Sequence, residues 1–414
     1  MNPRRSMSQT ILRLGLWLAA GTVAVLALSG CSSTGPTSPA ASVTLLVDPG
    51  GGGDYTNIQS ALNAASSGDT VLVAPATYTG GQNRDLDFGG ENIVLVASAA
   101  RDSVVIDCEG LGRGFYLHSG ETAAAVIDGL VVQNGVANRG GGAYIDGASP
   151  TIRNTTFRDN QANLDGGGLY MRNASPTLSE VTFESNASSI SGGGIMCDPS
   201  SAPSLSHVDF IENESGSGAG MSLIFSDGAS LFEVTFVSNE ASSYAGGLYC
   251  GGADVSLDEA TFISNRAREG GAIALSTSSP SISHATIVNN ESVDGGGIYC
   301  ANGSSPTIRT SIIALNLGEG SVFCADEGTS EPDTRRCCLY GNFISDIPCG
   351  TSDNVLYDDP LLCDLPGGDV TLCSNSPCLP GGNPWGVRIG DRGEGCADCA
   401  STRRPIGKPA DAAH

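Results

Sequence analysis

Lysine is almost missing from this chain of 414 residues, since Lys408 is the only one. Lys and Arg together number 20 against 44 Asp and Glu, so the formal net charge is −24 at pH 7. An acidic surface repels nucleic-acid phosphates and anionic lipid headgroups. Polyanionic sugars are repelled in the same way unless a Ca²⁺ ion bridges them to the protein. We therefore expect no nucleic-acid partner.

Aromatic residues and helical patterns are also scarce. Aromatics make up 6% of the chain, whereas glycine accounts for 57 residues. High Gly and Ser content with few aromatics is unusual for a compact globule and suits a chain with many tight turns. No segment carries apolar residues at helical spacing over about ten residues. The length then indicates either two or three ordinary domains or one long repeat array.

The N-terminus reads as a targeting segment. Arg4, Arg5 and Arg13 precede the short apolar run LWLAAGTVAVLAL, which predicts a secretory signal over residues 1–30. The closing LSGC resembles the bacterial lipobox, which implies that Cys31 becomes the lipidated first residue of an exported lipoprotein. Several acyl chains on one residue would anchor it stably. The alternative is an uncleaved anchor helix, for which the apolar run is short.

The same resemblance gives an expected location. The residue after Cys31 is Ser32 and not Asp, which resembles the sorting signal for the outer membrane. We therefore expect an outer-membrane lipoprotein on the periplasmic or cell-surface face, held to the membrane through its lipid alone. Residues 31–43, rich in Ser and Pro, would form a flexible tether.

A period of 25 to 27 residues organises the rest of the chain. It is carried by Asn134, Asn160, Asn186, Asn213, Asn239, Asn265, Asn290 and Asn316. The apolar residues three positions earlier are Val131, Phe157, Phe183, Phe210, Phe236, Phe262, Ile287 and Ile313. A fixed period with small drift indicates stacked equivalent units.

The content of one unit predicts short strands. SPTIRNTTF at 149–157 is β-branched and bounded by Pro, and GGLYM at 167–171 is a short apolar run after glycines. Such units describe the coils of a parallel β-solenoid, stacked about 4.8 Å apart. In the stretch FISNRAREGGAI, Phe262 would join an interior ladder and Asn265 would tolerate a left-handed corner and bond its stacked neighbours. Gly270 and Gly271 would turn the chain or pack too closely for a Cβ.

The alternation of F-x-x-N with G-G-[AIL] resembles the repeats of chlamydial polymorphic outer membrane proteins. Residues 52–80 look like the opening of pectin-lyase-like right-handed β-helix proteins, with a short capping helix at 57–66, and residues 358–382 resemble the closing coil of that class. The resemblance covers about 43–395. It implies an all-β, right-handed parallel β-helix of about eleven or twelve coils over 44–345, a Cys-rich closing coil and cap over 346–400, and a disordered tail over 401–414.

This fold carries many functions, so the family resemblance alone does not assign one. The chain lacks the N-T-D, D-D, H-G and R-I-K signatures of polygalacturonases, and the Asp cluster with catalytic Arg of pectate lyases. We therefore expect a non-catalytic envelope or surface protein that binds an extended ligand, either a glycan or a partner protein. The alternatives are a polysaccharide lyase or glycoside hydrolase, and an inert spacer.

Most of the fourteen cysteines fall into two groups. Cys197, Cys250, Cys300 and Cys324 share one register and read as buried fillers, although Cys300 and Cys324 on adjacent coils could bridge. An exported chain favours disulfides over zinc for the C-terminal group, which comprises Cys337, Cys338, Cys349, Cys363, Cys373, Cys378, Cys396 and Cys399. The spacing of Cys396 and Cys399 suits zinc, but no second pair of that spacing accompanies them.

In a solenoid, a site is a column of equivalent positions on successive coils. The column three residues before the Phe ladder contains Asn154, Glu180, His207, Glu233, Glu259, His284 and Thr310. It should point outward or lie at a bend. The candidate ligand-binding residues are Glu180, His207, Glu233, Glu259 and His284.

Three interpretations of this column remain open. Glu180, His207 and Glu233 could bind a divalent metal. Glu233 and Glu259 have roughly the carboxylate separation of a retaining glycosidase. The third interpretation is a solvated polar face without chemistry, and no residue is assigned a catalytic role.

A second column lies before the glycine turn and contains Arg139, Asp165, Ser191, Ala245, Glu269 and Asp294. Arg139 and Asp165 should form an exposed pair of little energetic value. Glu269 and Asp294 should repel each other unless Ca²⁺ lies between them. Apart from that possible Ca²⁺, we expect no cofactor.

Overall fold

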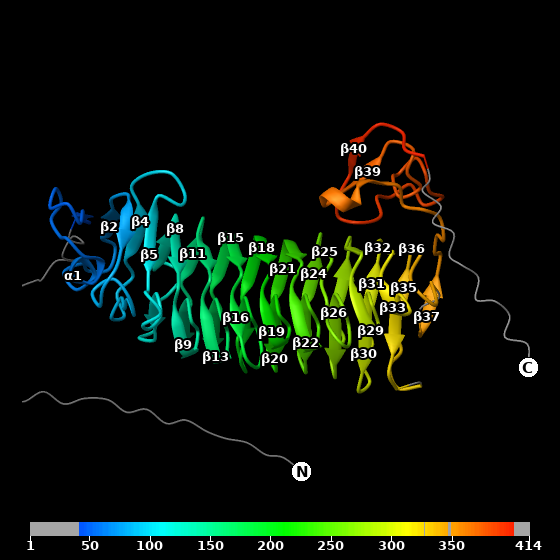
Figure 1. Ribbon diagram of the computed structural model, residues 1–414, viewed down its shortest axis with the longest axis horizontal. Coiled ribbons are helices and arrows are strands. Elements are labelled where there is room, and N and C mark those ends of the chain that lie inside the picture. The colour runs from blue at the N-terminus through cyan, green and yellow to red at the C-terminus, as the bar shows by residue number, and fades with distance from the viewer. Residues whose placement is uncertain (1–40, 327, 347–348, 401–414) are drawn as a thin grey trace, which may run out of the picture. The chain divides into compact units, whose positions relative to one another are not determined.

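Short parallel strands stack coil upon coil in the computed structural model, which describes residues 41–326, 328–346 and 349–400. The predicted signal segment, Cys31 and the tail over 401–414 lie outside these residues. Figure 1 shows the strands of successive coils side by side. No helix in the described part of the chain is long and apolar enough to cross a membrane. The predicted all-β parallel solenoid is confirmed.

Most coils contribute two consecutive stretches to a first sheet, which has 21 strands, whereas the coils of β1 (Thr44–Val47) and β37 (Thr351–Asp353) contribute one each. The first stretches are β1, β2 (Thr70–Val73), β4 (Val94–Ala97), β7 (Val126–Asp128), β11 (Thr151–Arg153), β15 (Thr177–Glu184), β18 (Ser204–Ile211), β21 (Ser230–Val237), β24 (Ser256–Asp258), β27 (Ser281–Ser283), β31 (Thr307–Arg309), β35 (Asp333–Arg335) and β37. These thirteen stacked strands exceed the expected eleven or twelve coils, because pairing begins with β1 and continues through β37.

The second stretches lie beyond a bend in the same sheet, and β15, β18 and β21 run through that bend without interruption. The separate ones are β3 (Ala76–Tyr78), β5 (Val104–Asp107), β8 (Leu130–Gln133), β12 (Thr156–Arg158), β25 (Thr261–Ile263), β28 (Thr286–Val288), β32 (Ile312–Ala314) and β36 (Cys338–Tyr340).

Two further sheets complete the coil. The second sheet consists of β6 (Phe115–Leu117), β10 (Ala143–Asp146), β14 (Leu169–Arg172), β17 (Ile195–Cys197), β20 (Met221–Ile224), β23 (Leu248–Gly251), β26 (Ile273–Ser276), β30 (Ile298–Ala301) and β34 (Val322–Cys324). The third sheet consists of β9 (Val136–Arg139), β13 (Gln161–Asp165), β16 (Ala187–Ser188), β19 (Glu214–Ser217) and β22 (Glu240–Tyr244). On the later coils, the equivalent positions form a separate two-stranded sheet of β29 (Glu291–Asp294) and β33 (Leu317–Glu319).

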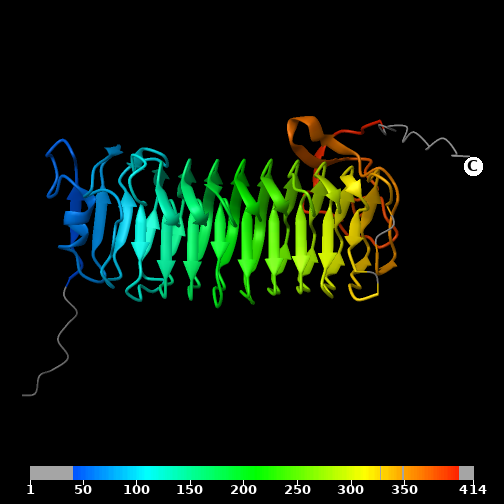
Figure 2. The same ribbon diagram turned by 60° about the horizontal axis from the view of Figure 1, so that its bottom comes forward.

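The one α-helix among the described residues is α1 (Ile58–Leu62), which is shorter than the expected 57–66. Asn57 caps it by accepting a hydrogen bond from the Ser60 amide, and Ile58 and Leu62 are buried. A polar N-cap followed by apolar residues explains why the helix begins there. Figure 2 shows it at the N-terminal end of the stack.

An aromatic ladder fills the interior, as predicted. Phe157, Phe183, Phe210, Phe236 and Phe262 are fully buried. Their rings stack nearly parallel, with centroids 4.6 to 5.3 Å apart. In-register parallel pairing places each ring one coil above the last, so the ladder follows directly from the repeat.

A buried asparagine ladder runs beside the rings. Each Nδ2 donates to the Oδ1 of the next coil at 2.9 to 3.1 Å, from Asn160 as far as Asn342. Asn342 in turn donates to the Asp346 carboxylate at 2.9 Å. The predicted amide bonding is confirmed and extends one coil further than expected.

The predicted left-handed corner is wrong by one residue. The residue before each ladder asparagine has positive φ, for example Ser238 at 53° and Ser264 at 55°. The asparagine itself points inward and satisfies backbone carbonyls, as Asn239 does for Phe210. The left-handed backbone conformation therefore falls on the residue before each ladder asparagine. The asparagine itself is required because its side-chain amide bonds the buried carbonyls.

The first coil of the predicted repeat is also out of register by one. Val132, not Val131, pairs with Phe157, and Gly135 therefore takes the ladder position in place of Asn134. The amide of Gly135 donates to Asn160 Oδ1 at 2.9 Å. Two adjacent valines made both registers equally consistent with an apolar pattern.

Glycines act at the turn as predicted. Gly270 has φ of 71°, and a Cβ on Gly271 would lie 2.7 Å from the Gly296 carbonyl oxygen. The first needs left-handed backbone freedom, and the second has no room for a side chain because the next coil is too close.

A cap follows the last coil. It contains β38 (Leu362–Asp364), the 3₁₀ turn Leu365–Gly367, β39 (Asp369–Cys373) and β40 (Glu394–Cys396). Disulfides Cys363–Cys396 and Cys373–Cys399 tie it together, and Cys324–Cys349 fastens the end of the second sheet.

The disulfide prediction is confirmed for part of the C-terminal group. Cys337, Cys338 and Cys378 are buried thiols instead, and so is Cys108, which falls in neither group. The suggested Cys300–Cys324 bridge is wrong. The two residues pair in register, which holds their parallel side chains about one strand spacing apart, too far for a disulfide. Cys197, Cys250 and Cys300 are buried fillers as expected, and burial raises the pKa of Cys250 to about 12.

Candidate functional site

The predicted Glu/His column lies at the bend of the first sheet. Glu180, His207, Glu233, Glu259 and His284 all have left-handed backbone, with φ between 48° and 55°. Such a conformation costs a residue with a Cβ roughly 1–2 kcal/mol. Asn154 and Thr310 at the ends of the column share it, so the strain belongs to the bend itself and does not mark chemistry.

The centre of the column is open and carries an imidazole–carboxylate pair. His207 Nε2 contacts Glu233 Oε2, and their side chains are 52% and 36% exposed. Phe232, also exposed, meets the His207 ring edge-on, with centroids 6.3 Å apart. One apolar ring, one imidazole and one carboxylate thus lie together on β18 and β21.

His284 makes a different contact. Its Nδ1 lies 3.0 Å from Asp258 Oδ1 on the preceding coil, and Ser283 donates to the same oxygen at 2.7 Å. Burial raises the pKa of Asp258, but the hydrogen bonds from Ser283 and His284 outweigh it, so the pKa is lowered. The partner of His284 is therefore Asp258, which lies outside the predicted column, and not Glu259.

Glu259 is held from outside the repeats. Arg388 Nη2 of the cap lies 2.6 Å from Glu259 Oε1. Nearby, the Asp391 side chain accepts a hydrogen bond from Thr261, and its amide donates to Thr286 Oγ1 at 3.2 Å. Figures 1 and 2 show the cap folded back over the coils of β25 to β36.

Apolar contacts hold the cap in this position. Ile389, Val370 and Leu372 of the cap pack against the outward side chains Ile263 and Val288. In earlier coils the same outward position carries Arg158 and Glu184. Ile211 and Val237, between them in the same column, are also apolar but are not part of this cluster, so the apolar pattern alone did not mark the covered face.

A second segment covers the other end of this face. In the loop between β4 and β5, Arg101 donates to Thr182 Oγ1 at 3.0 Å, and Asp102 accepts from Thr156 at 3.4 Å. Between the Arg101 loop and the Arg388 cap, β18 and β21 carry the exposed residues His207 and Phe232. We call the residues His207, Ile211, Phe232, Glu233 and Val237 the open strip.

The second predicted column needs one correction. Tyr244, not Ala245, follows Ser217 and precedes Glu269 in the stack, because Ala245 occupies the left-handed position that glycine takes in other coils. The column also continues from Asp294 to Glu319.

The Arg139–Asp165 pair is less exposed than expected. The two groups are 3.0 Å apart, but Asp165 is 7% exposed. Burial raises the pKa of Asp165 more than the Arg139 hydrogen bond lowers it. Removing Arg139 would therefore leave a buried, unpaired carboxylate.

The described residues assemble no carboxylate–imidazole metal site. Among His, Cys, Asp and Glu of the described residues, one group has the ligand atoms of three or more side chains within 4.8 Å of one another. It consists of Cys363, Cys373 and Cys396, whose sulfurs are all in disulfides. A Ca²⁺ ion between Glu269 and Asp294, which lie in register on adjacent coils, stays a prediction.

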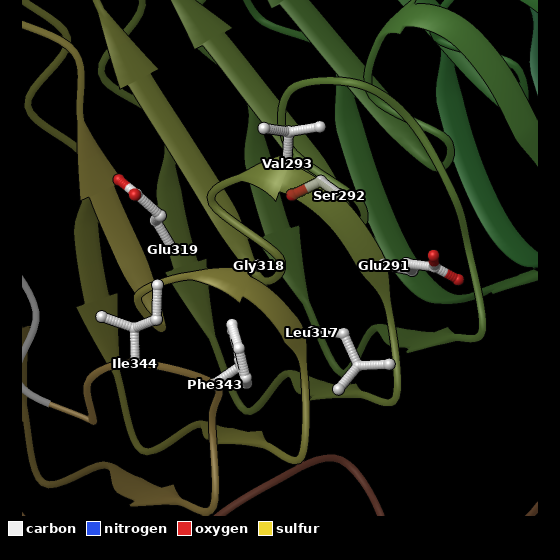
Figure 3. Close-up of a pocket in the computed structure, with 8 residues that line it drawn as sticks. All are labelled: Glu291, Ser292, Val293, Leu317, Gly318, Glu319, Phe343 and Ile344. Carbon is white, nitrogen blue, oxygen red and sulfur yellow. The ribbon is translucent and has the colours of Figure 1, made fainter. Parts of the chain in front are cut away.

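A hollow of about 400 Å³ lies on β29 and β33, near the C-terminal end of the third sheet. Figure 3 shows Val293, Leu317, Phe343 and Ile344 around it, with Glu291 and Glu319 at its sides. The apolar residues are strongly exposed, Ile344 to 68%. No periodic signal predicted this hollow, because Phe343 and Ile344 follow the last repeat.

Comparisons with known proteins concern the fold. The family model described as "Right handed beta helix region" matches residues 97–262 and 193–357. No curated protein matches the chain. Among solved structures, pectate lyase Pel9A is similar with a TM-score of 0.45 and 15% identity, covering 85% of this chain and 96% of that one. A mannuronic acid specific polysaccharide family 6 lyase from human gut microbiota has a TM-score of 0.40 and 14% identity, covering 76% and 83%.

Proposed function

The chain belongs to the right-handed β-helix family, and on that premise we propose that it binds an extended polysaccharide across the open strip without changing it chemically. The single observation behind this proposal is that His207, Phe232 and Glu233 are exposed together between two covering segments. Sugars present apolar ring faces and hydroxyl edges. An exposed aromatic ring beside an imidazole and a carboxylate complements both.

The stacking of coils supports an extended ligand. Equivalent positions recur about every 4.8 Å along the stack. Ile211 and Val237, in register on β18 and β21, add partly exposed apolar surface further along the same two strands, beyond the bend. Between the Arg101 loop and the cap, a polymer segment would meet the equivalent positions His207 and Glu233 on two successive coils.

The contacts of the two carboxylates favour binding over catalysis. A retaining glycosidase needs two carboxylates directed at one bond. Glu233 contacts His207 on the preceding coil, whereas Glu259 contacts Arg388 of the cap. Charge-assisted hydrogen bonds of this kind hold each carboxylate in place, so Glu233 and Glu259 are committed to different partners.

One observation favours a second candidate, a polysaccharide lyase. A carboxylate that orients an imidazole is a usual arrangement for a general base. The His207–Glu233 pair has that composition and is accessible. The two candidates differ in one outcome, since only the lyase forms a new unsaturated chain end.

The test uses the chain from residue 32, incubated with plant, algal and bacterial polysaccharides with and without Ca²⁺. Binding and newly formed unsaturated or reducing ends are measured together. We expect binding without product, weakened up to about tenfold by Phe232→Ala through the loss of ring contact. Phe225→Ala is the matched control, since Phe225 is 68% exposed on a turn.

The other outcomes are equally informative. Product that disappears in Glu233→Gln replaces the binding proposal with the lyase or a hydrolase. Neither binding nor product from any polysaccharide contradicts both candidates and directs the search to a partner protein.

A further inference from the structure

An aromatic row runs along the outer side of the second sheet. In register, it contains Tyr116, Tyr144, Tyr170, Met196, Ser222, Tyr249, Ala274, Tyr299 and Phe323. The residues on either side of this row, such as Leu248 and Cys250, point into the core. The glycine turn folds tightly against the row, since a Cβ on Gly270 would lie 2.8 Å from Ala274 Cβ. The last residues of the third-sheet strands are thereby brought beside the tyrosines.

We call the place where the third-sheet strands end beside this row the corner. In the N-terminal coils, arginine side chains of the protein itself lie at this corner. The Arg113 guanidinium lies 5.1 Å from the ring centroid of Tyr116 and 5.5 Å from that of Tyr144. Arg139 lies 5.2 Å from the Tyr170 centroid. Such distances are those of cation–π attraction, in which the negative face of the ring attracts the charge. The protein's own arginines thus occupy the ring faces there.

In the C-terminal coils the same corner lacks such a cation. The Tyr244 ring centroid lies 5.8 Å from that of Tyr249 and 6.4 Å from that of Tyr299. Among the described residues, no arginine is found over any of these three rings. Arg268 approaches Glu269 only at 4.0 Å, and its side chain is 73% exposed.

Negative charge collects at this second corner. Glu269, Asp294 and Glu319 lie in register on three adjacent coils, with spacing of about 4.8 Å. Burial and then the neighbouring Glu269 carboxylate raise the pKa of Tyr299, as expected for a carboxylate close to that ring. Like charges at this spacing repel one another, and a positive ligand would relieve the repulsion. Figure 3 labels Glu319 among the residues around the hollow on β29 and β33.

We propose that Tyr244, Tyr249 and Tyr299, with Glu269 and Asp294, bind an organic ammonium group. The cation would lie against the tyrosine faces, where arginine lies in the first corner, and the carboxylates would neutralise it. Tyr244 is 39% exposed and Tyr249 and Tyr299 are half-buried, so a ligand would reach the site from the Tyr244 side. This site is separate from the open strip and does not depend on the proposed polysaccharide function.

The test compares charge at constant shape. Choline and 3,3-dimethyl-1-butanol differ essentially in replacing nitrogen by carbon, so only the first is cationic. Each is titrated into the chain from residue 32, with binding followed by calorimetry and tyrosine fluorescence. We expect choline to bind at least about tenfold more tightly than the neutral alcohol. A parallel arm with glucosamine and glucose distinguishes an amino sugar from a quaternary ammonium group as the preferred source.

Variants connect the binding to this corner. Tyr244→Leu should weaken cation binding at least about tenfold and Tyr244→Phe should restore it, because the ring and not the hydroxyl attracts the charge. Glu269→Gln should weaken binding several-fold. Tyr357→Leu changes a tyrosine that is 50% exposed and belongs to neither proposed site, so it is the matched control and should have no effect.

Three results would overturn the proposal. The first is equal binding of the neutral alcohol, and the second is cation binding that Tyr244→Leu leaves unchanged in a folded variant. The third is the absence of saturable binding of either cation below about 10 mM, which corresponds to less than about 3 kcal/mol.

Discussion

Arg388 Nη2 lies 2.6 Å from Glu259 Oε1, although 129 residues separate the two along the chain. The contact joins a non-repetitive cap to a member of the repeat column. It brings an arginine to an acidic position where the repeats themselves supply none, and it closes one side of the open strip.

Loss of this ion pair should loosen the cap more than it lowers global stability. Both side chains are partly exposed, 34% and 27%, so the pair contributes no more than about 1 kcal/mol. We expect Arg388→Ala to change the unfolding midpoint only slightly and to speed amide hydrogen exchange in residues 383–391. Arg153→Ala, which removes a comparable exposed pair with Asp128, is the control. Unchanged exchange in the cap would show that apolar packing alone holds it.

The asparagine ladder should be sensitive in its interior. Asn239→Ala leaves the Phe210 carbonyl without this buried side-chain donor, and it leaves the backbone and side-chain amides of Asn213 without their acceptor. An unsatisfied buried polar group costs about 1–3 kcal/mol, so we expect a destabilisation of at least that size in urea. Asn163→Ala removes an exposed cross-coil amide contact and should cost less than about 0.5 kcal/mol. Equal effects of the two changes would contradict the role assigned to burial.

Gly271→Ala should be among the most damaging small substitutions. The added Cβ would lie 2.7 Å from the Gly296 carbonyl oxygen and 2.8 Å from that of Glu291. Because both atoms are backbone of the next coil, relief requires moving that coil, and we expect a loss above about 2 kcal/mol or failure to fold. At Gly381 nothing lies within 4 Å of an added Cβ. Gly381→Ala should therefore leave the melting temperature unchanged.

The carboxyl group of Asp391 should make stability fall as pH rises. Burial raises the pKa of Asp391, and the hydrogen bond from Thr261, the nearby Thr286 hydroxyl and the charge of Arg392 offset this only in part. The folded state then binds the proton more strongly than the unfolded state. The stabilisation is fully present below the ordinary pKa of 3.8 and is lost as pH rises through the higher folded value.

Asp391→Asn tests this sign, because the amide keeps the shape and removes the ionisation. We expect urea midpoints of the variant to depend less on pH from about pH 4 upward than those of the unmodified chain. At neutral pH the variant should be the more stable of the two. A steeper pH dependence in the variant would contradict the assignment.

Cys31→Ser tests the proposed anchor, which rests on the resemblance of LSGC to a lipobox. Acylation of Cys31 would hold the chain on the membrane, since several acyl chains on one residue bind it stably. We expect the unmodified protein in the membrane fraction and the variant in the soluble fraction. Ser32→Ala is the control for a neighbouring change, and membrane retention of Cys31→Ser would exclude the lipid anchor.

The repeating parts of the fold were predictable, because every coil needs an apolar side chain inside and an amide at the same position to bond its neighbours. Phe262 and Asn265 could be placed from their period alone, and their ladders are found. Register was wrong where an adjacent residue could fill the same position. Val131 was assigned where Val132 stands, because both are apolar, and Ala245 was assigned where Tyr244 stands. A one-residue error exchanges the faces of a strand, which is how the aromatic second corner escaped prediction.

The docking of the cap could not be derived from periodicity at all. Arg388, Ile389 and Asp391 belong to a unique segment, so no column contains them. The outward residues Ile263 and Val288 are apolar, but so are Ile211 and Val237 in the open strip, so the pattern alone does not mark the covered face. Long-range contacts between a repeat and a non-repeat require the three-dimensional structure.

The asparagine ladder also gives the molecule a direction. From Asn160 onward every amide donates toward the C-terminal end, so the side-chain dipoles align and each bond polarises the next. A further coil inserted anywhere inside would continue this line by simple translation and introduce no new kind of contact. The negative charge of Asp346, which accepts from Asn342, ends the line. The length of such a protein can therefore change in steps of one coil, while its terminus is specified by a single carboxylate.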